Sequence, residues 1–210
     1  MTNFKVPYVE FMKHAQKVVR GPAIKTRPVL GGVYHHDNTI AVTDAHRLYY
    51  ATDMNEGAGE ARNVSPITGA EINEGKFPDI TRLIPEEGSE EQLTAIYDVT
   101  KLYDYVRAIE IISRINKTSD ILALEFDSDY FSIRTVDEIT DGVAKYVEGT
   151  RKPNDIKTLY ANIKYVKEAL MLLRDAKAEK VEIKYYGNNR PFTLSSGNLL
   201  TLIMPIRKGA

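Results

Sequence analysis

The chain has 210 residues, of which 43% are hydrophobic and 27% charged, and its formal net charge is −1. This is the composition of a soluble globular protein with room for one large domain or two small ones. No run approaches the roughly 18 apolar residues of a membrane span, and the N-terminus lacks a signal-peptide core. Because cysteine is absent, disulfides, thiolate metal sites and a cysteine nucleophile are excluded. The simplest location for such a chain is the cytoplasm.

The first part of the chain predicts one helix among short strands. We expect strands at residues 3–6, 29–35, 39–43 and 48–52, and a helix at residues 8–20. Asp37-Asn38 is the expected turn between the second and third strands. The expected core stripe of the helix consists of Val9, Met12, Gln16 and Val19. Its opposite stripe is basic and consists of Lys13, Lys17 and Arg20.

Residues 53–76 differ in composition from what precedes them. They contain four glycines, few large apolar side chains and no clear period. We interpret them as a long loop or a remnant of structure. Residues 77–85 form a connector, and the boundary is expected at residues 86–88. The sequence thus predicts a first domain at residues 1–84 and a second at residues 85–210.

The second part repeats one pattern. Residues 92–149 and 155–206 each predict a strand, a helix and three strands, a β-α-β-β-β unit. The strands are expected at residues 92–98, 121–126, 130–135, 142–149, 155–161, 181–186, 191–195 and 199–206. The helices are expected at residues 101–115, capped by Thr100, and 163–175, capped by Asn162. Their expected core positions are Leu102, Val106, Ile109, Ile112, Ile163, Val166, Leu170 and Leu173. A helix on one face of each antiparallel sheet is an α+β fold.

The residues offer little for catalysis. Potential metal ligands occur at His35, His36, Asp44 and His46. Adjacent strand residues point to opposite faces, so at most one of the neighbouring histidines can join a cluster. A general base at His46 has no serine or cysteine nucleophile motif to serve. Gly31-Gly32 is not followed by the Lys of a phosphate-binding loop. We therefore expect no enzyme, no metal and no cofactor.

Four segments carry a family resemblance: RPVLGGV at residues 27–33, TDAHRL at 43–48, GKFPD at 75–79 and MPIR at 204–207. In this order they resemble the sliding clamp of bacterial DNA polymerase III, its beta subunit. The likeness begins in the family's middle domain, skips that domain's second half and continues through the C-terminal domain. It implies the DNA-clamp fold, in which repeated β-α-β-β-β units place strands in an outer ring and helices around a central hole. It also implies a shortened, phage-type member.

The resemblance implies a peptide-binding pocket, which in the family lies between the middle and C-terminal domains and attaches polymerases and repair enzymes. The matching residues of the first part are Leu30, Thr43, His46, Arg47, Leu48, Pro78 and Leu83. Those of the second part are Asn162, Tyr165, Pro191, Met204, Pro205, Ile206 and Arg207. Leu48, Leu83 and Met204 are expected to hold apolar side chains of the peptide. His46 and Arg47 are expected to orient its backbone or carboxamides.

Each of the three expected helices carries basic residues opposite its apolar stripe. Such stripes around a hole would attract DNA phosphates in a salt-sensitive way without reading bases. The expected DNA-binding residues on the helices are Lys13, Lys17, Arg20, Arg107, Arg114, Lys164, Lys167 and Arg174. Lys25 and Arg27 match a segment that touches DNA in the family, although the family's following tyrosine pair is replaced by Pro28-Val29.

The implied function is that of a polymerase processivity factor, which encircles duplex DNA and tethers replication proteins through short peptides. The expected partners are double-stranded DNA, a DNA polymerase, other clamp-binding proteins and a clamp loader. A chain this short closes a ring most naturally as a head-to-tail trimer. The alternative is a non-encircling adaptor or decoy that keeps only the peptide pocket. Residues 53–76 separate the two, because a ring needs them to fold into a substitute with a pairing edge.

Overall fold

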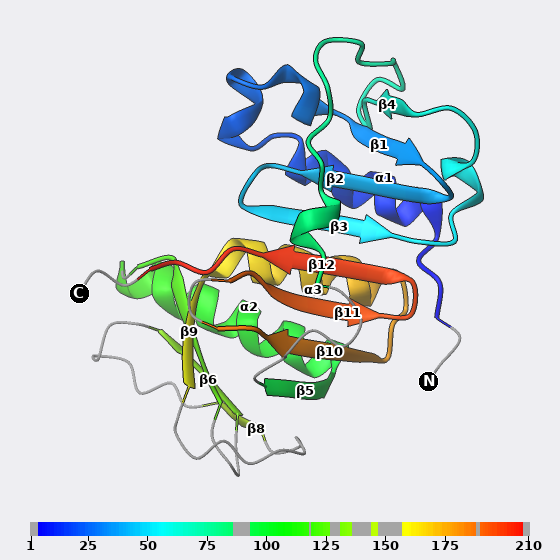
Figure 1. Ribbon diagram of the computed structural model, residues 1–210. Coiled ribbons are helices and arrows are strands. Elements are labelled where there is room, and N and C mark those ends of the chain that lie inside the picture. The colour runs from blue at the N-terminus through cyan, green and yellow to red at the C-terminus, as the bar shows by residue number, and fades with distance from the viewer. Residues whose placement is uncertain are drawn as a thin grey trace. The chain divides into compact units, whose positions relative to one another are not determined.

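The structure is a computed structural model that describes residues 4–85, 93–117, 119–126, 131–135, 144–146, 157–187 and 190–207 (Figure 1). The chain forms two compact units. The first comprises Met1–Glu86 with Ser195–Leu202, and the second comprises Glu87–Leu194 with Ile203–Ala210. Within the described ranges, no helix combines the length and the apolar character needed to cross a membrane.

The first unit combines one long helix with an antiparallel sheet. The helix is α1 (Tyr8–Val18), and the strands are β1 (Val33–His36), β2 (Thr39–Thr43), β3 (Arg47–Ala51), β4 (Arg62–Val64) and β12 (Leu199–Ile203). Their order is β4-β1-β2-β3-β12. Short 3-10 helices lie in the connections: η1 (Pro22–Lys25), η2 (Pro28–Gly31), η3 (Asn55–Gly57) and η4 (Thr81–Leu83). The predicted turn at Asp37-Asn38 is confirmed, since both residues have the positive φ of a two-residue type I′ hairpin, 49° and 57°.

Two strand predictions in this unit are wrong. The strand expected from Val29 starts only at Val33. Pro28 fixes a helical φ, and the Leu30 N–H donates to the Arg27 carbonyl at 3.0 Å, so residues 28–31 coil into η2. The described part of the strand expected at residues 3–6 forms no ladder. Instead the Val6 N–H donates to the Asn198 side chain at 2.8 Å.

The buried stripe of α1 also differs from the predicted one. Phe11, Ala15 and Val18 are buried, together with His14, whereas Val9 is 72% exposed. Burying the large ring of Phe11 removes more apolar surface from water than burying Val9, and the helix turns accordingly. α1 packs against β2. Val9 consequently shares the exposed side of the helix with Lys13.

Residues 53–76, predicted as a loop or a structural remnant, contain η3 and the strand β4. Val64 of β4 bridges to Glu71, and the Ile72 N–H donates to the Asn63 carbonyl at 2.7 Å. A Cβ on Gly57 would lie 2.4 Å from the Thr39 carbonyl oxygen, so only glycine fits where η3 meets β2. The chain then crosses the sheet on the face opposite α1 (Figure 1).

The second unit contains the predicted repeat apart from its last strand, β12. Its elements are β5 (Leu93–Asp98), α2 (Val99–Asn116), β6 (Ile121–Phe126), β7 (Phe131–Thr135), β8 (Ala144–Tyr146), β9 (Lys157–Asn162), α3 (Ile163–Asp175), β10 (Lys180–Tyr185) and β11 (Phe192–Ser196). Strands follow the order β8-β7-β6-β9 in one sheet, while β10 lies between β11 and β5 in another. The α+β class with β-α-β-β-β units is confirmed. The ends of several predicted strands lie outside the described residues, at 92, 130, 142–143, 147–149 and 155–156.

The two helices of this unit pack side by side (Figure 1). The predicted cap of α3 is confirmed, because the Asn162 side chain accepts hydrogen bonds from the N–H groups of Lys164 and Tyr165. The cap of α2 is Asp98 and not Thr100. The Asp98 carboxylate, a charged acceptor at the positive end of the helix, accepts from the Lys101 N–H at 2.9 Å.

Candidate functional site

The polar corner between β2 and β3 is held together from within. Oδ1 of Asp44 accepts hydrogen bonds from the N–H groups of His46 and Arg47, both at 3.0 Å. Its Oδ2 accepts from Nε of Arg47, also at 3.0 Å. The Thr43 hydroxyl donates to the Arg47 carbonyl at 2.7 Å. Asp44 and Arg47 are 0% and 2% exposed, so this ion pair is sealed inside the first unit.

The corner also contacts the end of α1. A Cβ on Gly21 would lie 2.7 Å from Cβ of Asp44, so glycine allows this close approach. Nη2 of Arg47 donates to the Lys17 carbonyl at 3.4 Å. Arg47 is therefore part of the scaffold. His46, by contrast, is exposed at the tip of the corner.

An apolar cluster lies on the sheet face opposite α1. It consists of Leu30, Ala41, Leu48, Phe77, Ile80 and Leu202. The Phe77 ring stacks on Tyr34 at 4.8 Å between centroids and 5° between planes, which fixes the connector on the sheet. The structure thus brings Leu30 and Leu48 of the predicted peptide site together but buries both to 2% exposure or less.

The connector after this cluster presents the two remaining first-unit residues to solvent. Oδ1 of Asp79 accepts hydrogen bonds from the N–H and the hydroxyl of Thr81, at 3.1 and 2.5 Å. These two hydrogen bonds hold the pKa of the Asp79 carboxyl below its ordinary value. The resulting turn opens η4, where Leu83 is 45% exposed, and Pro78 just before it is exposed as well.

In the second unit the predicted peptide-site residues lie at the end of β9, in the first turn of α3, just before β11 and in the terminal segment. The Ile206 N–H donates to the Tyr160 carbonyl at 2.8 Å, which fixes the terminal segment Met204–Arg207 beside that strand. Asn162 ends β9, and Tyr165 follows in the first turn of α3. Met204 is 38% exposed, Arg207 is exposed, and Pro191, Pro205 and Ile206 are half-buried.

The predicted DNA-binding residues differ in how exposed they are and in whether a carboxylate pairs with them. In the first unit Arg20, Lys25 and Arg27 are exposed, as is Lys13, which pairs with Glu10 at 3.1 Å. Lys17 is half-buried. In the second unit Arg107 and Lys164 are exposed and, among the described residues, no carboxylate lies within ion-pair distance of either.

The other three predicted DNA-binding residues of α2 and α3 are paired. Lys167 Nζ lies 2.5 Å from Oε1 of Glu110, and Arg114 lies 3.7 Å from the same oxygen. Arg174 pairs with Asp175 at 3.0 Å and lies over the Tyr103 ring, 3.9 Å from its centroid. Sequence periodicity predicts these cations but cannot show which of them a neighbouring helix neutralises.

The histidines considered as metal ligands have other partners. Nδ1 of the buried His35 lies 2.9 Å from the Val33 carbonyl, and its Nε2 lies 3.0 Å from the Tyr8 hydroxyl. Burial lowers the pKa of His35 below its ordinary value, and burial likewise raises the pKa of Tyr8. His36, on the opposite face of β1, pairs with Asp37 at 2.8 Å.

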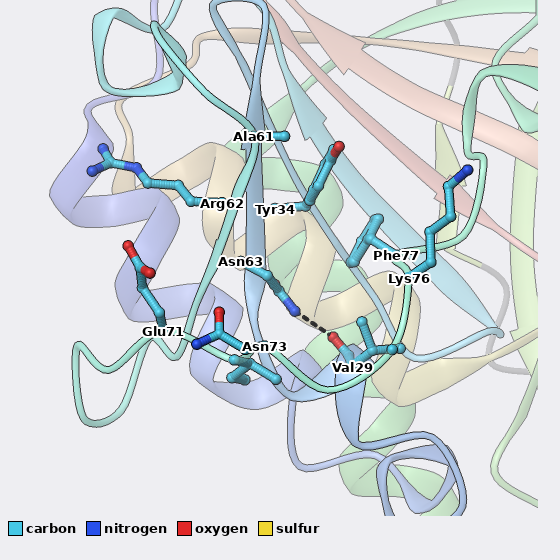
Figure 2. Close-up of a pocket in the computed structure, with 11 residues that line it drawn as sticks. Val29, Tyr34, Ala61, Arg62, Asn63, Glu71, Asn73, Lys76 and Phe77 are labelled. Atoms are coloured by element: carbon cyan, nitrogen blue, oxygen red, sulfur yellow. Dashed lines mark hydrogen bonds between the residues drawn. The ribbon is translucent and has the colours of Figure 1, made fainter.

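The first unit contains a cavity of about 350 Å³ that the sequence did not predict. Figure 2 shows the residues that line it. It lies where residues 71–77 run beside β4 and β1. The Asn63 side chain, which donates to the Val29 carbonyl at 2.7 Å, lies near its centre. The lining contains two cationic side chains and one carboxylate, those of Arg62, Lys76 and Glu71. It arises from the folding of residues 53–76, where the sequence has no clear period, and none of the predicted site residues lines it.

The architecture described above defines a class of protein by its fold, which is that of DNA sliding clamps. The beta subunit from DNA polymerase of Streptococcus pyogenes matches with a TM-score of 0.73 and 20% identity, over 99% of this chain and 67% of that chain. The sliding clamp of Bacillus subtilis matches with a TM-score of 0.73 and 18% identity, over 97% and 64%. A Helicobacter pylori beta clamp bound to a DNA ligase peptide matches with a TM-score of 0.73 and 15% identity, over 97% and 64%.

The amino-acid sequence is similar to the same proteins. The beta sliding clamp of Staphylococcus aureus is 26% identical over 235 residues, covering 87% of this chain and 58% of the relative. That of Lactococcus lactis is 26% identical over 150 residues, covering 70% and 38%. No family model matches the chain. The predicted resemblance to beta sliding clamps is confirmed, and the chain spans little more than half the length of its Staphylococcus aureus relative.

Proposed function

We propose that this chain is a sliding clamp that encircles duplex DNA and tethers replication proteins through a peptide-binding site. The observation that carries the proposal is the presence, in one clamp-fold chain, of the sealed Asp44–Arg47 corner and the anchored segment Met204–Arg207. These are two of the segments on which the sequence resemblance rests. A peptide-bound Helicobacter pylori clamp of the same fold supports the peptide part of the proposal.

The proposed peptide site combines exposed contact residues with a buried frame. Leu83 and Met204, both partly exposed and apolar, would contact apolar side chains of the peptide. His46 would meet its polar groups. Leu30, Arg47 and Leu48 would act indirectly, because their burial leaves them to support the residues around them.

A labelled clamp-binding peptide tests this site. Replacing both Leu83 and Met204 by Ala should weaken its binding by about 1–3 kcal/mol, the apolar contact that two partly exposed side chains can lose. Ile67→Ala is the matched control, because Ile67 is 54% exposed and lies in the hairpin after β4. Equal binding by the wild type, the double variant and the control would reject the site.

The proposed DNA surface depends most on Arg107 and Lys164, which have no ion-pair partner among the described residues. Reversing both Arg107 and Lys164 to Glu should abolish retention on duplex DNA at low salt, since phosphate contacts dominate such binding. Reversing Lys5 and Lys180, which are also exposed, gives the same change in net charge elsewhere in the chain. If both double variants lose retention equally, net charge explains the attraction to DNA, and the proposed DNA-binding surface is rejected.

The ring itself is tested by the mass in solution. We propose a head-to-tail trimer, because a heterologous interface that closes on itself generates a ring. Light scattering over a concentration series should give a stable trimer. A monomer at every concentration would favour the alternative function, a non-encircling adaptor or decoy that keeps the peptide site.

A further inference from the structure

Glu110 on α2 forms an ion pair with the basic face of α3. Its Oε1 lies 2.5 Å from Lys167 Nζ on the neighbouring helix and 3.7 Å from Nη2 of Arg114, one turn further along α2. The side chains of Glu110 and Lys167 are only 18% and 19% exposed. One carboxylate therefore faces two of the cations predicted to bind DNA.

Partial burial makes this contact stronger than an ordinary surface ion pair. Water screens an exposed pair almost completely, whereas a pair largely withdrawn from solvent keeps much of its attraction. A phosphate that approaches Lys167 must either displace Glu110 or interact with a charge that is already compensated. Lys167 should accordingly contribute less to phosphate binding than the exposed Lys164 on the same helix.

We propose that Glu110 is an internal competitor of DNA phosphate, which holds Lys167 partly neutralised and so keeps the affinity for DNA low. This inference rests on the proposed function, because it concerns the DNA-facing side of a sliding clamp. A protein that slides needs contacts that break as readily as they form. An internal carboxylate supplies that property without removing the cations that attract DNA.

The test is Glu110→Gln in the full chain, with binding of a fluorescent linear duplex measured over a range of salt concentrations. The variant should bind several-fold more tightly at equal salt. The plot of log affinity against log salt should steepen by about one, the signature of one additional neutralised phosphate. In a Lys167→Ala background the same substitution should have much less effect, because the main cation that Glu110 neutralises is gone.

Glu125→Gln is the matched control. Glu125 pairs with Arg134 at 2.7 Å and is 19% exposed, so this change also removes one negative charge and one half-buried ion pair. Its pair joins β6 and β7 and does not involve the helices. If both variants tighten binding equally, net charge explains the effect and the role of Glu110 is rejected. An unchanged affinity for Glu110→Gln rejects it as well.

If Glu110→Gln does not fold, single alanine variants decide, because Lys167→Ala should lower DNA affinity less than Lys164→Ala. An equal or larger loss for Lys167→Ala overturns the inference. If the wild type and every variant fail to bind duplex DNA at low salt, the DNA-binding part of the proposed function fails together with this inference. Wild-type binding with no special effect of Glu110 removes the inference alone.

Discussion

The predicted peptide-site residues include a buried group in the first unit and exposed residues in both units. In the first unit Leu30, Arg47 and Leu48 are at most 2% exposed, whereas in the second Met204 is 38% exposed. A buried side chain affects a ligand by holding its neighbours in place, and an exposed one affects it by contact. Substitutions should therefore separate stability from binding, with large losses of stability in the first group and small ones in the second.

Asp44→Asn should produce the largest effect. The amide can still accept from the N–H groups of His46 and Arg47, but the Arg47 guanidinium loses the carboxylate that now lies 3.0 Å away. Removing one partner of a buried ion pair costs about 3–5 kcal/mol of unfolding free energy. Urea denaturation measures it.

Asp37→Asn is the control for this change. Asp37 is 82% exposed and has a positive φ that asparagine tolerates well, so its stability should change by less than about 0.5 kcal/mol. Similar losses for both variants would contradict a special role for the Asp44 corner.

Leu48→Ala should come next, with a loss of about 2–5 kcal/mol of unfolding free energy. Leu48 is 1% exposed and packs in the cluster with Phe77 and Ile80, so truncation leaves a cavity under the connector. Urea denaturation again gives the value, and a loss below about 1 kcal/mol would show that the connector collapses onto the sheet. Peptide binding by this variant is informative only at temperatures where it remains folded.

The sequence predicted much of the fold because long-range repetition and local signals agreed. Asn162 stands where α3 needs a side-chain acceptor, and Asp37-Asn38 suits a turn that requires positive φ twice. The prediction failed where local patterns conflicted. On α1, Val9 and Phe11 are both apolar, and only packing against β2 decides which is buried.

The site was predicted in its residues but not in their roles. TDAHRL identifies Arg47 and Leu48, yet only tertiary structure shows that Asp44 seals Arg47 inside the unit. The basic stripes are visible from spacing alone. That Glu110 of α2 compensates Lys167 of α3 depends on how the two helices pack, and the two residues lie 57 positions apart in sequence.

A buried titrating group, His35, lies on the sheet face of the first unit opposite the apolar cluster. His35 is 1% exposed, and burial, its largest influence, lowers its pKa from the ordinary value of 6.5. The unfolded chain therefore binds the proton more tightly than the folded one, and stability increases with pH in this range. The contribution of neutral His35 is complete above about pH 6.5 and declines as the pH falls from there through the folded-state pKa.

Urea midpoints measured from neutral to mildly acidic pH should reveal this decline. His35→Gln, which cannot titrate, should flatten it, whereas His36→Gln should not, because His36 has a half-exposed side chain on the other face of β1. Equal flattening by both variants would contradict the assignment to His35.

The smallest effect on stability is expected at Met204, beside a residue where it should be large. Ile203 is fully buried at the end of β12, and Ile203→Ala should cost about 2–5 kcal/mol. Met204→Ala, one position later at 38% exposure, should change the unfolding free energy by less than about 0.5 kcal/mol while still weakening a bound peptide. Urea denaturation and peptide titration on the same two preparations separate these effects. If Met204→Ala is as unstable as Ile203→Ala, Met204 supports the fold like a buried residue. The difference between buried supporting residues and exposed contact residues would then not hold at this end of the chain.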